Sequence, residues 1–158
     1  MSISLLLVIL AIIIWFWCSI EDLRYRELRT MVPVCLVNII ALVFIHIEYK
    51  ITFFSMFNFL AGGLVFYCCE LYNRLKNKTD KPLIGGADIV ILPSFTGILG
   101  FSSILFYIIF LILLLLSKVN KVKNVLNIPL EVKERSNGTP LIPLMLIAFI
   151  GIMINEFL

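Results

Sequence analysis

The sequence predicts an all-α polytopic membrane protein that forms one transmembrane domain over residues 1–158. Three observations support this fold class. Apolar residues make up 61% of the chain and charged residues 15%, whereas a soluble domain is about half apolar and about a quarter charged. The charged residues are clustered. Between the clusters, apolar runs long enough for membrane helices recur along the whole chain.

About six transmembrane helices are predicted, because backbone polar groups in lipid must bond within their own segment. The predicted spans cover residues 3–20, 31–47, 51–69, 84–101, 102–117 and 140–156. We expect the first span to be a retained helix and not a signal peptide, since no basic residue precedes it and no small-residue cleavage site follows it. The fourth span contains several glycines and Pro93, which predicts a broken or partly re-entrant helix that lines a cavity in the bundle.

The basic residues predict the orientation of these spans. Twelve of the thirteen Lys and Arg residues lie in the loops after the first, third and fifth spans, and Lys50 is the exception. The positive-inside rule then places those loops in the cytoplasm and both termini outside, in a multi-pass protein of the cytoplasmic membrane. Topology accounts for the net charge of +3, so the bilayer is an expected partner and nucleic acid is not.

The cysteine and histidine content predicts no metal site and no cofactor. The sequence holds one histidine, His46, and no Cys-x-x-Cys pair, whereas a zinc site needs several such ligands at suitable spacing. We therefore expect the cysteines to be small packing residues. They are Cys18, Cys35, Cys68 and Cys69.

Two carboxylates mark the expected functional site. Asp88 is the one charged residue between Leu83 and Ser117, and burying a charge in a span costs about 2.5–3.5 kcal/mol on insertion scales. Asp22 lies in "CSIEDLRYRELR", where the first span leaves the membrane, so the predicted topology brings both acids to the same leaflet at similar depth. A structural role remains open for each. Asp88 can stabilise a helix start, and Asp22 can pair with Arg26 one turn on.

Two carboxylates that share a site indicate aspartyl protease chemistry. Like charges at close range share one proton, so one acid can activate water while the other hydrogen-bonds the scissile carbonyl. Gly85, Gly86 and Ala87 precede Asp88 and carry no bulky side chain, which would let an extended substrate backbone approach that carboxylate.

Three motifs resemble those of the type 4 prepilin peptidases, a family of intramembrane aspartyl proteases. "DLRYREL" at 22–28 is similar to their D-x-R-x-R-x-I motif, and "GGAD" at 85–88 is similar to G-x-G-D. "GTPLIPLMLIAFIG" at 138–151 resembles the family's closing Pro-rich helix. The three matches fall in the family's order and span most of the chain.

The resemblance implies an endopeptidase that removes the short basic leader of pilin, pseudopilin or archaeal preflagellin precursors at the cytoplasmic face. Asp22 and Asp88 would be the catalytic pair. Arg24 and Arg26 of the first motif would bind substrate together with Gly85, Gly86 and Ala87. The chain looks like the short form, because it lacks the cysteine-bearing insert of members that also methylate the new N-terminus.

Several positions depart from the family pattern. Arg29 and Thr30 stand where Pro-Asn is usual, Ala87 replaces a glycine, and Val90 replaces a common lysine. These departures bear on efficiency and substrate choice more than on reaction class. The alternative from another class is a non-catalytic membrane scaffold or small carrier of a secretion or pilus system. A presenilin-like protease is disfavoured, because the chain contains no Tyr-Asp pair.

Overall fold

The computed structural model describes residues 2–25, 28, 30–77, 86–117 and 141–157. Throughout this part of the chain the regular structure is helical, as the sequence predicts. The α-helices are α1 (Ile3–Tyr25), α2 (Val32–Glu48), α3 (Phe53–Asn77), α4 (Gly86–Leu99), α5 (Ser103–Ser117) and α7 (Leu141–Phe157), and a 3-10 turn, η1 (Gly100–Ser102), links α4 to α5.

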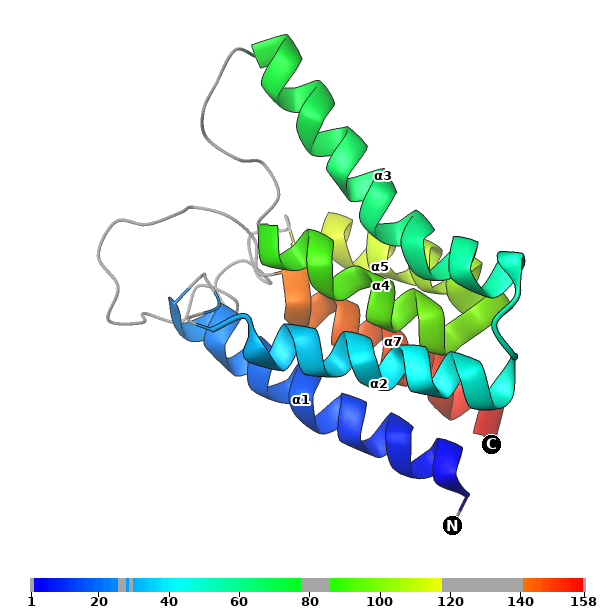
Figure 1. Cartoon of the computed structure of the whole chain (residues 1–158). Coiled ribbons are helices and arrows are strands. Elements are labelled where there is room, and N and C mark those ends of the chain that lie inside the picture. The colour runs from blue at the N-terminus through cyan, green and yellow to red at the C-terminus, as the bar shows by residue number, and fades with distance from the viewer. Residues whose placement is uncertain (1, 26–27, 29, 78–85, 118–140, 158) are drawn as a thin grey trace.

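Helix α4 occupies the centre of the bundle. It packs against α2, α3, α5 and α7, while α1 packs against α2 and α7. Figure 1 shows that α1 ends, and α2, α4 and α7 begin, at one end of the bundle, whereas both chain termini lie at the other end. Helix α3 crosses over α4, and its second half rises away from the other helices.

An aromatic cluster joins the helices in the core. Trp15 of α1 stacks on Phe95 of α4, with ring centroids 4.0 Å apart and planes inclined by 12°. Phe149 of α7 meets the Trp15 ring edge-on at 4.6 Å. The indole nitrogen Nε1 of Trp15 donates to Ser94 Oγ at 3.0 Å, so the polar atom of this fully buried ring has its partner. These contacts fix the register of α1 against α4.

Small residues allow α3 to approach α4 closely. A Cβ atom added at Gly97 of α4 would lie 2.7 Å from the Phe59 ring and 2.9 Å from Ile45. A Cβ atom at Gly63 would lie 3.1 Å from the carbonyl oxygen of Ile89, which is the helical acceptor that the Pro93 nitrogen cannot use. This is the small-residue packing common between membrane helices.

The fourth predicted span is not broken within the described residues, because α4 is one continuous helix from Gly86 to Leu99. Helix α4 continues through Pro93 and ends before Gly100, whose φ of +56° is a left-handed conformation that glycine adopts readily. Asn58 of α3 holds this turn. Its side-chain amide donates to the carbonyl oxygens of Gly100 and, at 3.3 Å, of Thr96, and its Oδ1 accepts the Ser103 hydroxyl at 2.8 Å.

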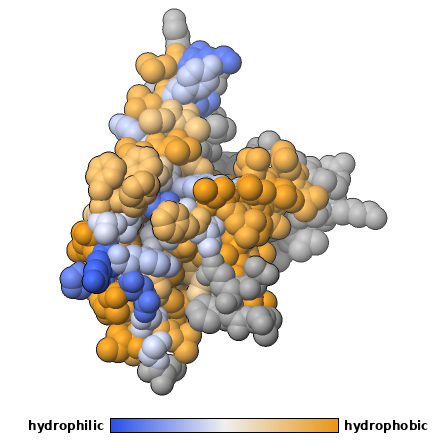
Figure 2. Space-filling view, turned by 90° about the vertical axis from the view of Figure 1, so that its right-hand side faces the viewer, coloured by the Kyte–Doolittle hydropathy of each residue, from blue (hydrophilic) through white to orange (hydrophobic). Residues whose placement is uncertain are grey.

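Three helical stretches are long and apolar enough to cross a membrane, namely Ile3–Arg24, Phe53–Lys76 and Gly86–Ser117. They indicate a membrane protein. Figure 2 shows mainly hydrophobic residues on the coloured part of the visible face, with hydrophilic residues at the end of α3 at the top and in a second patch lower on the left. The third stretch includes the Gly100 turn, while Val32–Glu48 and Leu141–Ile154 are shorter apolar helices. The number of crossings and the sidedness of the termini therefore stay predictions.

Candidate active site

Asp22 lies on the buried side of α1, in its last two turns. Its residue is only 8% exposed. The other buried residues of α1 recur three or four positions apart, which places them on the same stripe as Asp22. They are Val8, Ala11, Trp15, Cys18 and Ser19.

The start of α7 contacts Asp22. The backbone N–H of Ile142, the second residue of α7, donates to Asp22 Oδ2 at 3.3 Å. The first N–H groups of a helix have no partner within the helix, and they carry the positive end of its dipole, so a carboxylate is a favourable acceptor there. Two of the three predicted motifs thus meet at Asp22. The part of the third motif before Leu141 lies outside the described residues.

Asp88 occupies the first turn of α4 and is half-buried. An acidic residue at this position is favoured by the free N–H groups and the dipole of its own helix. The two residues before it differ in exposure, because Gly86 is exposed and Ala87 is half-buried. A Cβ atom added at Gly86 would meet no atom of another described residue within 4 Å, so Gly86 does not pack against the described helices.

The stacked pair Trp15 and Phe95 relates the two carboxylates. Asp22 follows Trp15 by seven residues, and Asp88 precedes Phe95 by seven. Helices α1 and α4 run in opposite directions (Figure 1), so both acids are displaced from the ring pair toward the same end of the bundle. The displacement along each helix is about 10 Å, since a helix rises about 1.5 Å per residue. Seven residues are close to two turns, so each carboxylate also shares the helix face of its ring. The two acids therefore lie at a similar level on the facing sides of α1 and α4.

The predicted substrate-binding arginines are not both described. Arg24 is exposed in the last turn of α1. Arg26 lies outside the described residues, as does Gly85 of the second motif. The ion pair expected between Asp22 and Arg26 is consequently untested.

Glu21, the acid adjacent to Asp22, points in a different direction. Its Oε1 accepts the Nε1–H of Trp17 at 2.8 Å, and Trp17 is 63% exposed. Consecutive helical residues are rotated by about 100°, so Glu21 and Asp22 lie on different sides of α1. This geometry separates the two acids that adjoin in the sequence.

Two buried polar residues were not predicted from the sequence. Glu70 of α3 is 5% exposed and accepts the Arg74 Nε–H at 2.6 Å, one turn on. Ser19 is also 5% exposed, and its hydroxyl has no hydrogen-bond partner in the described structure. The sequence shows that Glu70 is four residues from Arg74 and Ser19 three residues from Asp22. Their burial depends on the rotation of each helix about its axis, which the sequence does not show.

Among the described residues, no three His, Cys, Asp or Glu side chains are grouped so that they could hold a metal ion. His46 lies in the last turn of α2, at the end of the bundle away from Asp22 (Figure 1). Of the cysteines, Cys18 is buried, while Cys35, Cys68 and Cys69 are exposed. The chemical groups at the two predicted site positions are the carboxylates of Asp22 and Asp88.

No family model, curated protein or solved structure matches the chain. The resemblance to prepilin peptidases therefore rests on the three sequence motifs alone.

Proposed function

We propose that this chain is a membrane-embedded aspartyl endopeptidase that cleaves the short basic leader of type IV prepilin-like precursors at the cytoplasmic face. The observation that carries the proposal is the similar level of Asp22 and Asp88 on the facing sides of α1 and α4. Their partial burial adds support, because two acids close together with restricted water share a proton.

In the proposed reaction one carboxylate is ionised and the other is protonated. The ionised carboxylate takes a proton from water as the water oxygen bonds to the carbon of the scissile carbonyl. The protonated acid gives its proton to the carbonyl oxygen, which yields a gem-diol. The C–N bond then breaks as the first acid protonates the leaving amine and the second carboxylate takes a proton from a gem-diol hydroxyl. Both carboxyl groups return to their starting states.

The substrate approaches through the open space at Gly86. No other described residue has an atom within 4 Å of a Cβ atom added there, and the position is two residues from Asp88. An extended leader can therefore present its peptide bond beside the carboxylate. The apolar segment of the precursor remains among the spans or in lipid, and only the residues around the scissile bond need water.

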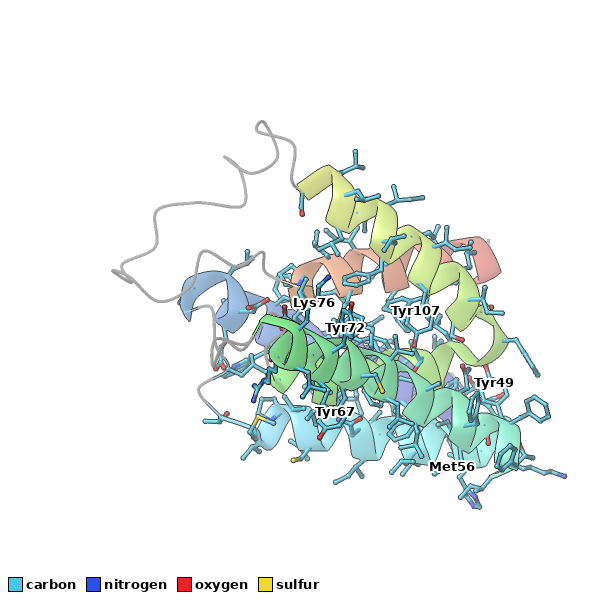
Figure 3. All side chains as sticks on the ribbon, turned by 90° about the horizontal axis from the view of Figure 1, so that it is seen from above. Tyr49, Met56, Tyr67, Tyr72, Lys76 and Tyr107 are labelled. Carbon is cyan, nitrogen blue, oxygen red and sulfur yellow. The ribbon has the colours of Figure 1, made fainter. Side chains whose placement is uncertain are left out.

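Six spans with both termini outside complete the proposal. The last turn of α3 supports a cytoplasmic location for the C-terminal end of that helix. It contains the basic residues Arg74 and Lys76, and the Lys76 ammonium lies 5.6 Å from the centroid of the Tyr72 ring. Figure 3 shows both labelled side chains on the second half of α3. Tyrosine and lysine are typical anchors at a membrane–water interface.

The proposal is tested with the purified full-length chain in detergent and a pilin precursor that carries its basic leader. We expect a shortened product whose mass corresponds to cleavage at the leader boundary, and no cleavage when both Asp22 and Asp88 are changed to Asn. An intact precursor after prolonged incubation with the unaltered chain would contradict the proposal.

A non-catalytic membrane scaffold is the second candidate function, and one observation favours it. The bond from Ile142 N–H to Asp22 gives that carboxylate a structural task at the start of α7. A scaffold would need this hydrogen-bond acceptor but not an ionisable group, so the two candidates separate at Asp22→Asn.

A further inference from the structure

Ser19 carries a buried hydroxyl that the rest of the described structure does not use. Serines inside helices usually donate to a carbonyl oxygen three or four residues back. The buried residues Ser94 and Ser117 do so here, at 2.6 Å to the Ile91 oxygen and 2.7 Å to the Leu114 oxygen. Ser19 Oγ is buried without such a bond, or any other, among the described residues. A buried hydroxyl without a partner destabilises the fold, so a function is the economical explanation.

The position of Ser19 connects it to the carboxylates. It precedes Asp22 by three residues on the same buried stripe of α1, and Cβ atoms at this spacing are about 5–6 Å apart. Side chains at this spacing are neighbours on the helix surface, so one water molecule can hydrogen-bond to both a serine hydroxyl and a carboxylate there. Trp15 lies one turn before Ser19 on this stripe, and its ring stacks on Phe95.

We infer that Ser19 is a positioning residue whose hydroxyl holds the water that Asp22 and Asp88 activate. This inference rests on the proposed peptidase function. The water donates one hydrogen to the ionised carboxylate, which will remove it, and the other to Ser19 Oγ. Its lone pairs then face the carbon of the scissile carbonyl. Ser19 undergoes no covalent change and carries no proton through the reaction.

The test compares Ser19→Ala, Ser19→Thr and the control Ser117→Ala, all in the full-length chain with a pilin precursor. Ser117 is a matched control, because it is a buried serine in the last turn of α5 and its hydroxyl is bonded within its own helix. For each variant we measure kcat, KM and Tm. We expect Ser19→Ala to lower kcat about tenfold with KM unchanged, as for the loss of one hydrogen bond to the reacting water.

The two stability readouts separate positioning from packing. Ser19→Ala should leave Tm unchanged or raise it, because it removes a buried hydroxyl without a protein partner. Ser19→Thr keeps a hydroxyl and should recover most of kcat, and Ser117→Ala should keep all of it. The role of Ser19 is wrong if kcat is unchanged in Ser19→Ala. It is also wrong if kcat falls together with Tm and Ser19→Thr does not restore it. Neither outcome contradicts the proposed peptidase function. If the wild-type chain shows no cleavage activity, both the peptidase proposal and the role of Ser19 are wrong.

Discussion

Asp22 has two tasks in the proposed site, and they need different properties of the side chain. The hydrogen bond from Ile142 N–H requires an oxygen acceptor, which an amide also provides. Water activation requires a carboxyl group that can ionise. Asparagine has nearly the shape of aspartate and retains one oxygen, so it separates the two tasks at a single position.

Asp22→Asn and Asp88→Asn should each lower leader cleavage at least about 100-fold, the range for loss of one general acid or base. Asp22→Asn should keep a Tm close to that of the unaltered chain, whereas Asp22→Ala should also lose about 1 kcal/mol of stability with the cap of α7. Cleavage is followed by mass spectrometry and Tm by thermal unfolding in the same detergent. Full activity in either Asn variant would favour the scaffold.

Glu21→Ala is the matched control for these substitutions. Glu21 adjoins Asp22 in the sequence, but it accepts the Trp17 indole N–H on a different side of α1. The variant should therefore retain most activity. A loss as large as that of Asp22→Asn would show that charge at this end of the bundle, and not the particular carboxylate, supports cleavage.

The sequence could single out Asp22 and Asp88 but not Ser19 or Glu70. A charge in or beside an apolar run stands out, because lipid burial penalises it. Serine is an ordinary residue of membrane helices, and whether its hydroxyl finds a partner depends on the rotation of α1 against its neighbours. Glu70 lies one residue beyond the predicted span 51–69, whereas α3 continues to Asn77.

At the scale of the helices, glycines serve two different purposes. Gly62 and Gly97 lie where neighbouring helices leave no room for a side chain. A Cβ atom added at Gly62 would lie 2.5 Å from the Tyr107 hydroxyl of α5, and one at Gly97 would lie 2.7 Å from the Phe59 ring. Figure 3 shows Tyr107 on the side of α5 that faces α3. Gly86 has no such contact with the described helices. Substitutions at these positions therefore distinguish packing from substrate access.

Gly86→Ala and Gly86→Val should reduce turnover in that order at unchanged Tm, because a larger and β-branched side chain fills the approach to Asp88. Gly97→Ala is the packing control and should lower stability by about 1–3 kcal/mol, since its Cβ would overlap the Phe59 ring. Turnover and Tm are measured on the same samples. If Tm falls in step with turnover in the Gly86 variants, substrate access through Gly86 is wrong.

Asn58→Ala tests the clasp on the turn between α4 and α5. The substitution leaves the Gly100 carbonyl oxygen and the Ser103 hydroxyl without the Asn58 side chain, so stability should fall by about 1–3 kcal/mol. Asn58→Asp is the companion variant, which keeps the acceptor for Ser103 but loses both donated bonds. Thermal unfolding measures both variants. A Tm unchanged in both would mean that Gly100 alone determines the turn.

Helix boundaries show where sequence reasoning reached its limit. The glycines and Pro93 predicted a broken fourth span, but α4 is one continuous helix from Gly86 to Leu99, and the turn Gly100–Ser102 lies at the predicted boundary between the fourth and fifth spans. This continuity could not be predicted, because Gly97 is used for packing against Phe59, and α4 continues past Pro93 with Gly63 facing the Ile89 carbonyl oxygen. The α-helix ends at Gly100, with Asn58 beside it. These choices depend on a partner helix, which the local sequence does not contain.

For the whole molecule, helix length leaves the number of crossings open. Helix α4 has 14 residues and α5 has 15, so each is about 21–23 Å long, against a hydrocarbon core of about 30 Å. They can cross separately only where the bilayer thins or protein surrounds their ends. The charge distribution is therefore the stronger evidence for topology, and it makes a prediction that helix lengths cannot make.

Cysteines at the two ends of α3 test this topology. Lys50 precedes α3 and Lys76 lies in its last turn, so the positive-inside rule places Lys50 outside and Lys76 in the cytoplasm. In a chain whose native cysteines are replaced by alanine, Lys50→Cys should react rapidly with a membrane-impermeant thiol reagent added to intact cells. Lys76→Cys should react only after the membrane is opened. Labelling of Lys76→Cys in intact cells, with Lys50→Cys protected, would reverse the orientation and place Asp22 and Asp88 on the face opposite a cytoplasmic leader.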